Sequence, residues 1–266
     1  MTEPVLSDLA QWQVAFRHQF RSYLRTYRFA ALVGTILVVQ IAIFAIILHY
    51  VGVGAVASGG DSAAFVVGLF TFLADFIYLS AALLGGDAIS TDFGGRNGYF
   101  VLVLPVRRAV LLLGRFAAAV LATVLITAIY ILGVALTTLY FFRSIPTTPL
   151  LETALLAFLF AAASVALAFF FSSLVKNSML SILLTVIVLI VALPLLTSIL
   201  ADVAQVTPWF SLVYAGGVIT EPLVAATSVG LVAPATIPQG VAIMAAYLAG
   251  FFALSYLFYE FKEATG

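Results

Sequence analysis

"MLSILLTVIVLIVALPLLTSIL", residues 179–200, decides the fold class of this chain. These 22 residues include no charged side chain. A bilayer core is roughly 30 Å thick and is crossed by about 20 apolar helical residues, so the stretch predicts a transmembrane helix. The rest of the chain has the same character, because 64% of its 266 residues are hydrophobic and 8% are charged, with a mean hydropathy of +1.23. These values exclude a soluble domain.

Similar apolar runs lie on both sides of this stretch. The sequence predicts six spans, at residues 29–50, 62–84, 109–142, 151–174, 179–200 and 240–259. The third run is longer than a bilayer requires, so we expect it to tilt or to extend beyond the membrane. We therefore expect one all-α polytopic membrane domain over residues 1–266. No internal sequence repeat is evident, so an inverted-repeat transporter has no support.

The segment at residues 5–28 differs from the spans because it is amphipathic. Aromatic residues recur every three or four positions, and arginines form a second stripe beside them. This pattern is typical of a helix that lies in the headgroup plane with its arginines near anionic lipid. The residues expected at the membrane interface are Trp12, Phe16, Arg17, Phe20, Arg21 and Arg25. A soluble helix that binds a partner is the alternative.

The distribution of basic residues predicts the orientation of the chain. If the N-terminus is cytoplasmic, ten of the eleven basic residues lie on the cytoplasmic side or near it, and Arg143 alone lies outside. Positively charged residues favour the cytoplasmic side of membrane proteins. We therefore expect a multi-pass protein of the plasma membrane with both termini cytoplasmic, and the segment at residues 85–108 is its principal cytoplasmic loop.

The segment at residues 201–239 is apolar but is interrupted by glycine, glutamate and proline near its middle. A continuous helix facing lipid is disfavoured by these residues. We expect two short helices that enter the membrane from the outer side and return. The alternative, a seventh span, would move the C-terminus and Lys262 to the outside.

The familiar signatures of catalysis are missing from the sequence. It contains no GxSxG, HExxH or GxxxxGK[ST] motif, no cysteine and two histidines. We expect no metal, no cofactor and no nucleotide site of its own, so any ATP-driven activity requires another subunit. A membrane enzyme or assembly factor is therefore poorly supported.

Asp75 is an ionisable residue near the middle of the predicted second span. Such residues are functional candidates by default and face protein or water. We expect Arg115, on the next span, to lie at a similar depth and to form an intramembrane polar pair with Asp75. The alternatives are a purely structural ion pair or a protonated carboxyl group hydrogen-bonded between helices.

The loop at residues 85–108 is longer than a turn requires and is rich in polar residues and glycine. The stretch at 87–92 predicts a short helix with acidic residues near its start, which the helix dipole favours. Such a helix suits docking to a soluble partner. The alternative is a solvated loop whose arginines anchor the flanking spans.

The order of residues in "GGDAISTDFGGRNGYFVLVLPVRRAVLLLGRFAAA", residues 85–119, resembles ATP-binding cassette exporter permeases of the type-2 membrane-domain class. The matching positions are Ile89, Ser90, Asp92, Pro105, Arg107, Arg108, Gly114 and Arg115. Asp92 replaces a commoner glutamate, Arg115 replaces a lysine, and residues 97–99 depart from the expected Gly-Thr pair. The N-terminal amphipathic helix, the six spans and the interrupted segment before the last span also resemble the layout of that family.

The resemblance implies an exporter subunit that works with a second permease copy, identical or a paralogue. It also implies two copies of an ATPase subunit that holds ATP and magnesium. By this resemblance the residues that contact the ATPase are Asp87, Ser90, Thr91, Asp92, Phe93, Arg96 and Asn97. The residues of the outer gate would be Pro208, Trp209, Phe210, Gly216, Gly217, Glu221 and Pro222. The alternative function is a secondary transporter or channel subunit that uses Asp75 as an ion or proton site.

Overall fold

The computed structural model describes residues 7–50, 52, 61–93, 108–227 and 236–264, and for residues 92, 93 and 261–264 it describes the backbone alone. Within these ranges every regular element is a helix. The six segments long and apolar enough to cross a membrane are Tyr27–Tyr50, Ser62–Gly85, Arg108–Phe142, Thr147–Leu174, Ser178–Val203 and Ile237–Glu260. The predicted all-α membrane fold is confirmed at this level, and each predicted span overlaps one of these segments.

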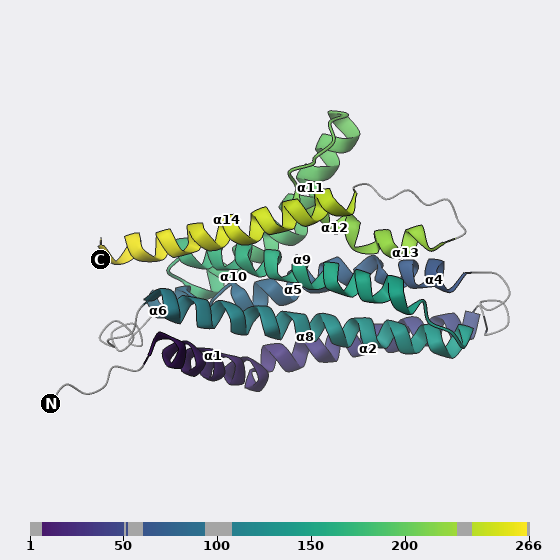
Figure 1. Cartoon of the computed structure of the whole chain (residues 1–266), viewed down its shortest axis with the longest axis horizontal. Coiled ribbons are helices and arrows are strands. Elements are labelled where there is room, and N and C mark those ends of the chain that lie inside the picture. Colours follow the sequence, from purple (N-terminus) through teal and green to yellow (C-terminus); the bar gives the residue numbers. More distant parts are fainter. Residues whose placement is uncertain (1–6, 51, 53–60, 94–107, 228–235, 265–266) are drawn as a thin grey trace.

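The elements follow the chain in the order drawn in Figure 1. They are α1 (Asp8–Arg25), α2 (Tyr27–Tyr50), α4 (Ser62–Leu69), η1 (Phe70–Phe72), α5 (Leu73–Gly85), α6 (Ser90–Phe93), α8 (Arg108–Phe142), α9 (Thr147–Leu174), α10 (Ser178–Val186), η2 (Ile187–Ala192), α11 (Leu193–Ser198), η3 (Ile199–Val203), α12 (Leu212–Gly216), η4 (Gly217–Thr220), α13 (Glu221–Ala225) and α14 (Ile237–Ala264). The start of α1, α6 and the end of α14 lie at the same end of the bundle, which we name the α6 end (Figure 1).

The amphipathic segment forms a helix of its own before the first span. The side chain of Ser7 caps α1 by accepting the N–H of Ala10 at 3.4 Å. Thr26 then adopts an extended backbone (φ −78°, ψ 139°), which ends α1, and α2 begins at the next residue. A single residue therefore separates the amphipathic helix from the first span.

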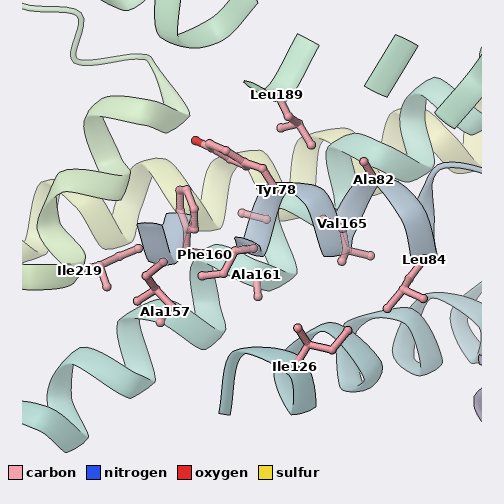
Figure 2. Packing of buried hydrophobic residues seen from close by; sticks show 14 of the residues in the cluster. Tyr78, Ala82, Leu84, Ile126, Ala157, Phe160, Ala161, Val165, Leu189 and Ile219 are labelled. Carbon is pink, nitrogen blue, oxygen red and sulfur yellow. The ribbon is translucent and has the colours of Figure 1, made fainter. Parts of the chain in front are cut away.

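The core of the bundle lies around α9, which packs against α5, α8 and α14. Ala157, Ala161 and Ala168 are fully buried, and small side chains of this kind allow helices in membranes to approach closely. Phe160 and Phe169 fill the space between these close contacts and are also fully buried. Figure 2 shows Phe160 and Ala161 of α9 among side chains from several other helices.

The second span is interrupted near its middle. The α-helix α4 gives way to the single 3₁₀ turn η1 before α5 continues. The hydroxyl group of Tyr130, on α8, donates a hydrogen bond to the carbonyl oxygen of Leu69 at this break. In a membrane an irregular turn is tolerated where neighbouring side chains satisfy the backbone groups that it frees. Tyr130 performs this role here.

The fifth span is also irregular. It is less buried than the second span and departs from the bundle. It alternates α-helical turns (α10, α11) with the π-helical turns η2 and η3. Pro194 lies in the first turn of α11, directly after η2, so the proline follows a π-helical turn. Figure 1 shows α11 and the turns after it rising away from the other spans.

Between the fifth and sixth spans the chain forms only short elements in the described part. These are α12, η4 and α13, and together they make one apolar stretch at Leu212–Ala225 that is shorter than the six spans. Gly217 begins η4 and Glu221 begins α13, so the predicted interruption falls where the helix type changes. Pro222 lies in the first turn of α13, where proline costs no helical hydrogen bond.

Candidate functional site at the end of the second span

Two glycines end the second span and allow the chain to approach the fifth span closely. A Cβ atom added at Gly86 would lie 3.2 Å from the Cα of Ile182 and would clash with the carbonyl oxygen of Ala82. Any larger residue would therefore displace backbone at this point. At Gly85 a Cβ atom would meet Ala168 of α9 at 3.1 Å. The glycine pair brings the following residues against α9 and α10.

Asp87 lies directly after this glycine pair and forms an ion pair with Arg28. The same guanidinium nitrogen of Arg28 donates to the carbonyl oxygen of Leu83 at 3.3 Å. The hydroxyl group of Ser178, at the start of α10, donates to the carboxylate of Asp87 at 3.4 Å. Asp87 keeps 13% of its side chain exposed and Arg28 keeps 40%, so the pair lies at the edge of the buried region.

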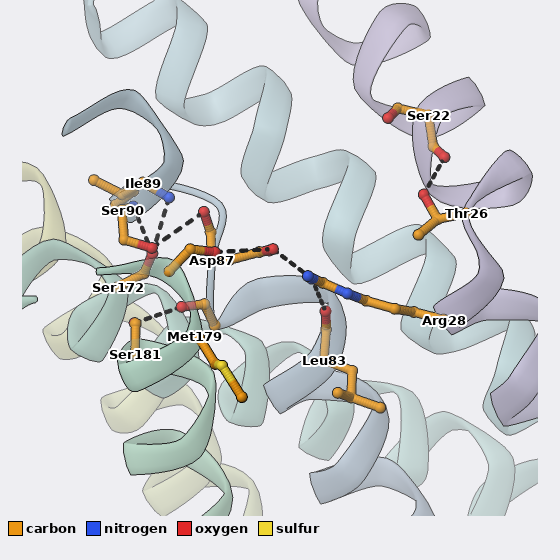
Figure 3. A network of polar contacts seen from close by, with 12 residues as sticks. Ser22, Thr26, Arg28, Leu83, Asp87, Ile89, Ser90, Ser172, Met179 and Ser181 are labelled. Carbon is orange, nitrogen blue, oxygen red and sulfur yellow. Dashed lines mark hydrogen bonds and ion pairs between the residues drawn. The ribbon is translucent and has the colours of Figure 1, made fainter. Parts of the chain in front are cut away.

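The backbone after Asp87 is held by two serines and an arginine. The hydroxyl oxygen of Ser172 accepts the N–H groups of Ile89 and Ser90 at 2.9 and 3.0 Å. The hydroxyl group of Ser181 donates to the carbonyl oxygen of Gly86. Figure 3 shows Asp87 joined to Arg28 and the N–H groups of residues 89 and 90 directed at Ser172.

Arg115 completes this arrangement from α8, because its guanidinium group donates to the carbonyl oxygen of Ala88 at 3.1 Å. We name the whole set the Asp87 cluster. It consists of Arg28, Asp87, Arg115, Ser172, Ser178 and Ser181. Its members come from α2, α8, α9 and α10 and from the end of the second span. The cluster thus connects residues 86–90, which lead into α6, to the four helices α2, α8, α9 and α10.

Tyr23 brings α1 to the edge of this cluster. Its side chain is 6% exposed, and burial raises the pKa of its hydroxyl group. The charges of Asp87, Arg115 and Arg28 all act on this hydroxyl group, so the tyrosine lies near all three. The amphipathic helix is therefore positioned against the cluster as well as against α8.

The residues predicted to contact an ATPase divide into three groups. Asp87 belongs to the Asp87 cluster, and the N–H group of Ser90 donates to Ser172 of that cluster. The side chain of Thr91, in contrast, is exposed in α6. Asp92 and Phe93 belong to α6, where the structure describes their backbone alone. Arg96 and Asn97 lie outside the described residues.

The predicted interfacial residues form two faces of α1. Trp12 stacks on Phe16 at 5.4 Å and Phe16 stacks on Phe20 at 5.8 Å, and these rings are half-buried. The arginine face is exposed and borders a surface cavity of about 690 Å³. The described residues that line it are Val14, Arg17, His18, Arg21, Ser22, Arg25 and Thr26. On the aromatic side, Gly114 of α8 allows close contact, since an added Cβ would lie 2.9 Å from that of Ala15.

Asp75 and Arg115 are not brought together in the described structure. Arg115 lies beside Ala88, beyond the end of α5, whereas Asp75 lies in the first turn of that helix. Ten residues of helix, roughly 15 Å, separate Asp75 from Gly85 along the axis. Among the described residues the carboxyl group of Asp75 makes no hydrogen bond or ion pair.

The residues predicted for the outer gate lie together between the fifth and sixth spans. Trp209 is 68% exposed and Phe210 is 45% exposed, while Pro208 is buried. The hydroxyl group of Tyr247, on α14, donates to the carbonyl oxygen of Phe210 at 3.1 Å. A cavity of about 480 Å³ adjoins them. Its lining residues are Thr197, Ala201, Gln205, Val206, Thr207, Pro208, Val213 and Tyr214. Gly216, Gly217, Glu221 and Pro222 follow in α12, η4 and α13.

Sequence reasoning did not identify the serines of the Asp87 cluster, or Arg28 as the partner of Asp87. Ser172 and Ser181 lie inside apolar runs, where serine commonly bonds to its own helix and carries no signal for a distant contact. Arg28 lies at helical spacing from the other arginines of residues 5–28, so the sequence does not distinguish it from them. Its position at the start of the first span, beside a one-residue break, was the available clue.

No family model matches the chain, and no curated protein matches it in sequence. The structure itself therefore supports the class of the molecule, a helical protein with six candidate membrane spans.

Proposed function

We propose that this chain is the permease subunit of an ATP-driven exporter of the type-2 class, with the Asp87 cluster as the point where an ATPase subunit transmits motion. A short helix at a membrane face moves a bundle only if it is attached firmly to the spans. The observation that carries the proposal is the attachment of residues 86–90 to α2, α8, α9 and α10 through side chains and backbone together.

The surface beyond the cluster supports the same interpretation. Thr91 projects from α6 with an exposed side chain, so a partner can reach this helix. The arginine face of α1 lies at the same end of the bundle. In the orientation that the basic residues predict, this α6 end faces the cytoplasm, where ATPase subunits act. The substrate would leave at the opposite face after passing between two permease copies.

The test uses the lack of cysteine in the chain, since a single introduced thiol is then unique. In membranes of the source organism, Thr91→Cys would be labelled with a maleimide that carries a second, photoactivated cross-linking group. Tyr50→Cys, which is 79% exposed near the other end of the first span, is the matched control. We expect Thr91→Cys to cross-link a subunit with a P-loop, identified by mass spectrometry, and Tyr50→Cys to give no such product.

The cross-link should also respond to the nucleotide state. A mechanical contact predicts that trapping the ATPase with ATP and vanadate changes the yield at residue 91 by severalfold. Capture of no P-loop subunit at residue 91, or equal capture at residue 50, would contradict the proposal.

A secondary transporter or channel is the second candidate function. The observation in its favour is Asp75, a carboxyl group near the middle of a span without a partner among the described residues. Flux in reconstituted vesicles that is driven by a pH gradient without ATP, and that Asp75→Asn abolishes, would favour this function over the exporter.

A further inference from the structure

Asp75 lies on a side of the second span that the described part of the chain leaves uncovered. Its side chain is exposed, and so is that of Thr71. Phe72 is 49% exposed, and a Cβ atom added at Gly68 would meet no other atom within 4 Å. Residues three, four and seven positions apart share one side of a helix, so these four form a continuous surface. We name it the Asp75 face.

The depth of this face makes an uncovered carboxyl group costly. Asp75 lies 13 residues after Ser62 and 10 before Gly85, near the middle of a 24-residue span. Ionisable groups at this depth face protein or a water-filled cavity and pair with another polar group. A contact with lipid tails alone is therefore disfavoured, and something polar covers the Asp75 face when the protein works.

A second copy of the chain does not bring a positive charge to Asp75. The basic residues within the six spans are Arg28, Arg108 and Arg115. Arg28 and Arg115 belong to the Asp87 cluster, and Arg108 is the first residue of α8. All three lie at or near the α6 end, so a copy packed with the same depth in the membrane brings no positive charge to Asp75.

The chemistry of the Asp75 face also disfavours a small inorganic cation. Hard metal ions require six or more oxygen ligands, and no group of three acidic or histidine residues that could hold a metal occurs among the described residues. The exposed neighbours of Asp75 are an aromatic ring, a hydroxyl group and a glycine. A carboxylate beside an exposed aromatic ring suits an organic cation, which gains from the charge and from the ring.

The break at η1 places this face at a point where the span can change shape. A 3₁₀ turn inside a long helix often marks a functional hinge. Here it ends three residues before Asp75, and Tyr130 donates to the Leu69 carbonyl at its start. Asp75 lies in the first turn of the helix that follows η1, so the hinge and the charged group are adjacent.

From these observations we infer that the Asp75 face binds the cationic group of a lipophilic organic cation near the middle of the membrane. The further statement that this cation is the exported substrate rests on the exporter function proposed above. Asp75 would supply the negative charge, Phe72 the aromatic contact, and Gly68 the space for a bulky ligand.

Binding to the purified full-length chain in nanodiscs of zwitterionic lipid tests the site without any ATPase. The probe is tetraphenylphosphonium, and the control is tetraphenylborate, an anion of nearly the same shape. We expect saturable binding of the cation that falls at least tenfold in affinity in Asp75→Asn, whereas the anion binds both forms equally. Asp75→Glu should restore most of the affinity, and Asp202→Asn, which removes an exposed acidic residue of η3, should leave it unchanged.

The two proposals fail in different ways. Unchanged affinity of Asp75→Asn for the cation, or equal wild-type affinity for cation and anion, would overturn the cation site. Loss of binding in both Asp75→Asn and Asp202→Asn would show a general charge effect and would also overturn it. Absence of a P-loop subunit in the cross-link at residue 91 would remove the exporter and leave the cation site standing.

Discussion

Asp75 and Asp87 lie twelve residues apart near the same span, and their surroundings are opposite. The carboxylate of Asp87 pairs with Arg28 and accepts a hydrogen bond from the hydroxyl group of Ser178. The backbone that follows it is bonded to Ser172 of α9. Asp75 is exposed and has no bonded partner among the described residues. One acidic residue therefore belongs to the structure of the bundle, whereas the other is the residue that we propose binds a ligand. Substitutions can test this contrast.

The largest effect is expected from Gly86→Ala, which should lower the free energy of unfolding by about 3 kcal/mol. The added methyl group would meet backbone atoms of Ala82 and Ile182, which can move only with their helices. Gly68→Ala is the matched control because no atom lies within 4 Å of the added group, and it should be neutral or slightly stabilising. Thermal unfolding in detergent measures both. Equal losses at the two glycines would contradict the close packing at residue 86.

The next effect is expected from Asp87→Ala, at about 2 kcal/mol. The substitution leaves the guanidinium group of Arg28 without its carboxylate partner in a partly buried site. Partial exposure of Arg28 keeps the loss below that of a fully buried pair. A double-mutant cycle with Arg28→Ala should give a coupling free energy of about 1 kcal/mol. Additive losses in the cycle would show that the two side chains act independently.

A smaller loss, about 1.5 kcal/mol, is expected from Ser172→Ala. The hydroxyl oxygen of Ser172 accepts two buried backbone N–H groups, at Ile89 and Ser90, and both would lose their acceptor. Ser164→Ala on the same helix is the control, because the Ser164 hydroxyl group donates only within α9, to Phe160. Hydrogen exchange at residues 89 and 90 should accelerate in the first variant alone. Unchanged exchange at residues 89 and 90 would show that Ser172 does not hold this backbone.

The smallest loss of stability is expected from Asp75→Asn, which should leave the free energy of unfolding unchanged or raise it, because it removes an ionisable group that no described residue pairs. No described hydrogen bond or ion pair is lost, so the folded bundle does not depend on this charge. The same thermal unfolding measurement compares it with Asp87→Asn. A loss as large as that of Asp87→Asn would remove the contrast between the two aspartates and assign Asp75 a structural role.

The fold was largely predictable because it follows from hydropathy. Runs of apolar residues long enough to cross a bilayer have one stable outcome, a helix, so six spans and the separate amphipathic helix were expected from the sequence. The interruption after the fifth span was likewise visible in Gly217 and Pro222. The π-helical turns η2 and η3 had no such signal, because their residues are ordinary apolar ones.

The candidate site was predictable only in part. The polar, glycine-rich stretch after residue 84 identified where the site begins, and Asp87 was among its expected residues. Its partners were not identified, since pairing across 59 residues depends on how the helices pack. Arg115 illustrates the difficulty, because its depth in the span did not reveal that it reaches back to Ala88 rather than toward Asp75.

The ion pair between Arg28 and Asp87 has a consequence for how the chain is made. Arg28 leaves the ribosome 59 residues before Asp87, at the leading end of the first span. At that moment its positive charge has no carboxylate partner and acts with the arginines of α1 as an orientation signal. Once the second span is inserted, the same charge joins Asp87. In the orientation that the basic residues predict, Arg28 would thus serve first in insertion and then in assembly, and a neutral residue there would raise the fraction of inverted chains as well as weaken the finished bundle.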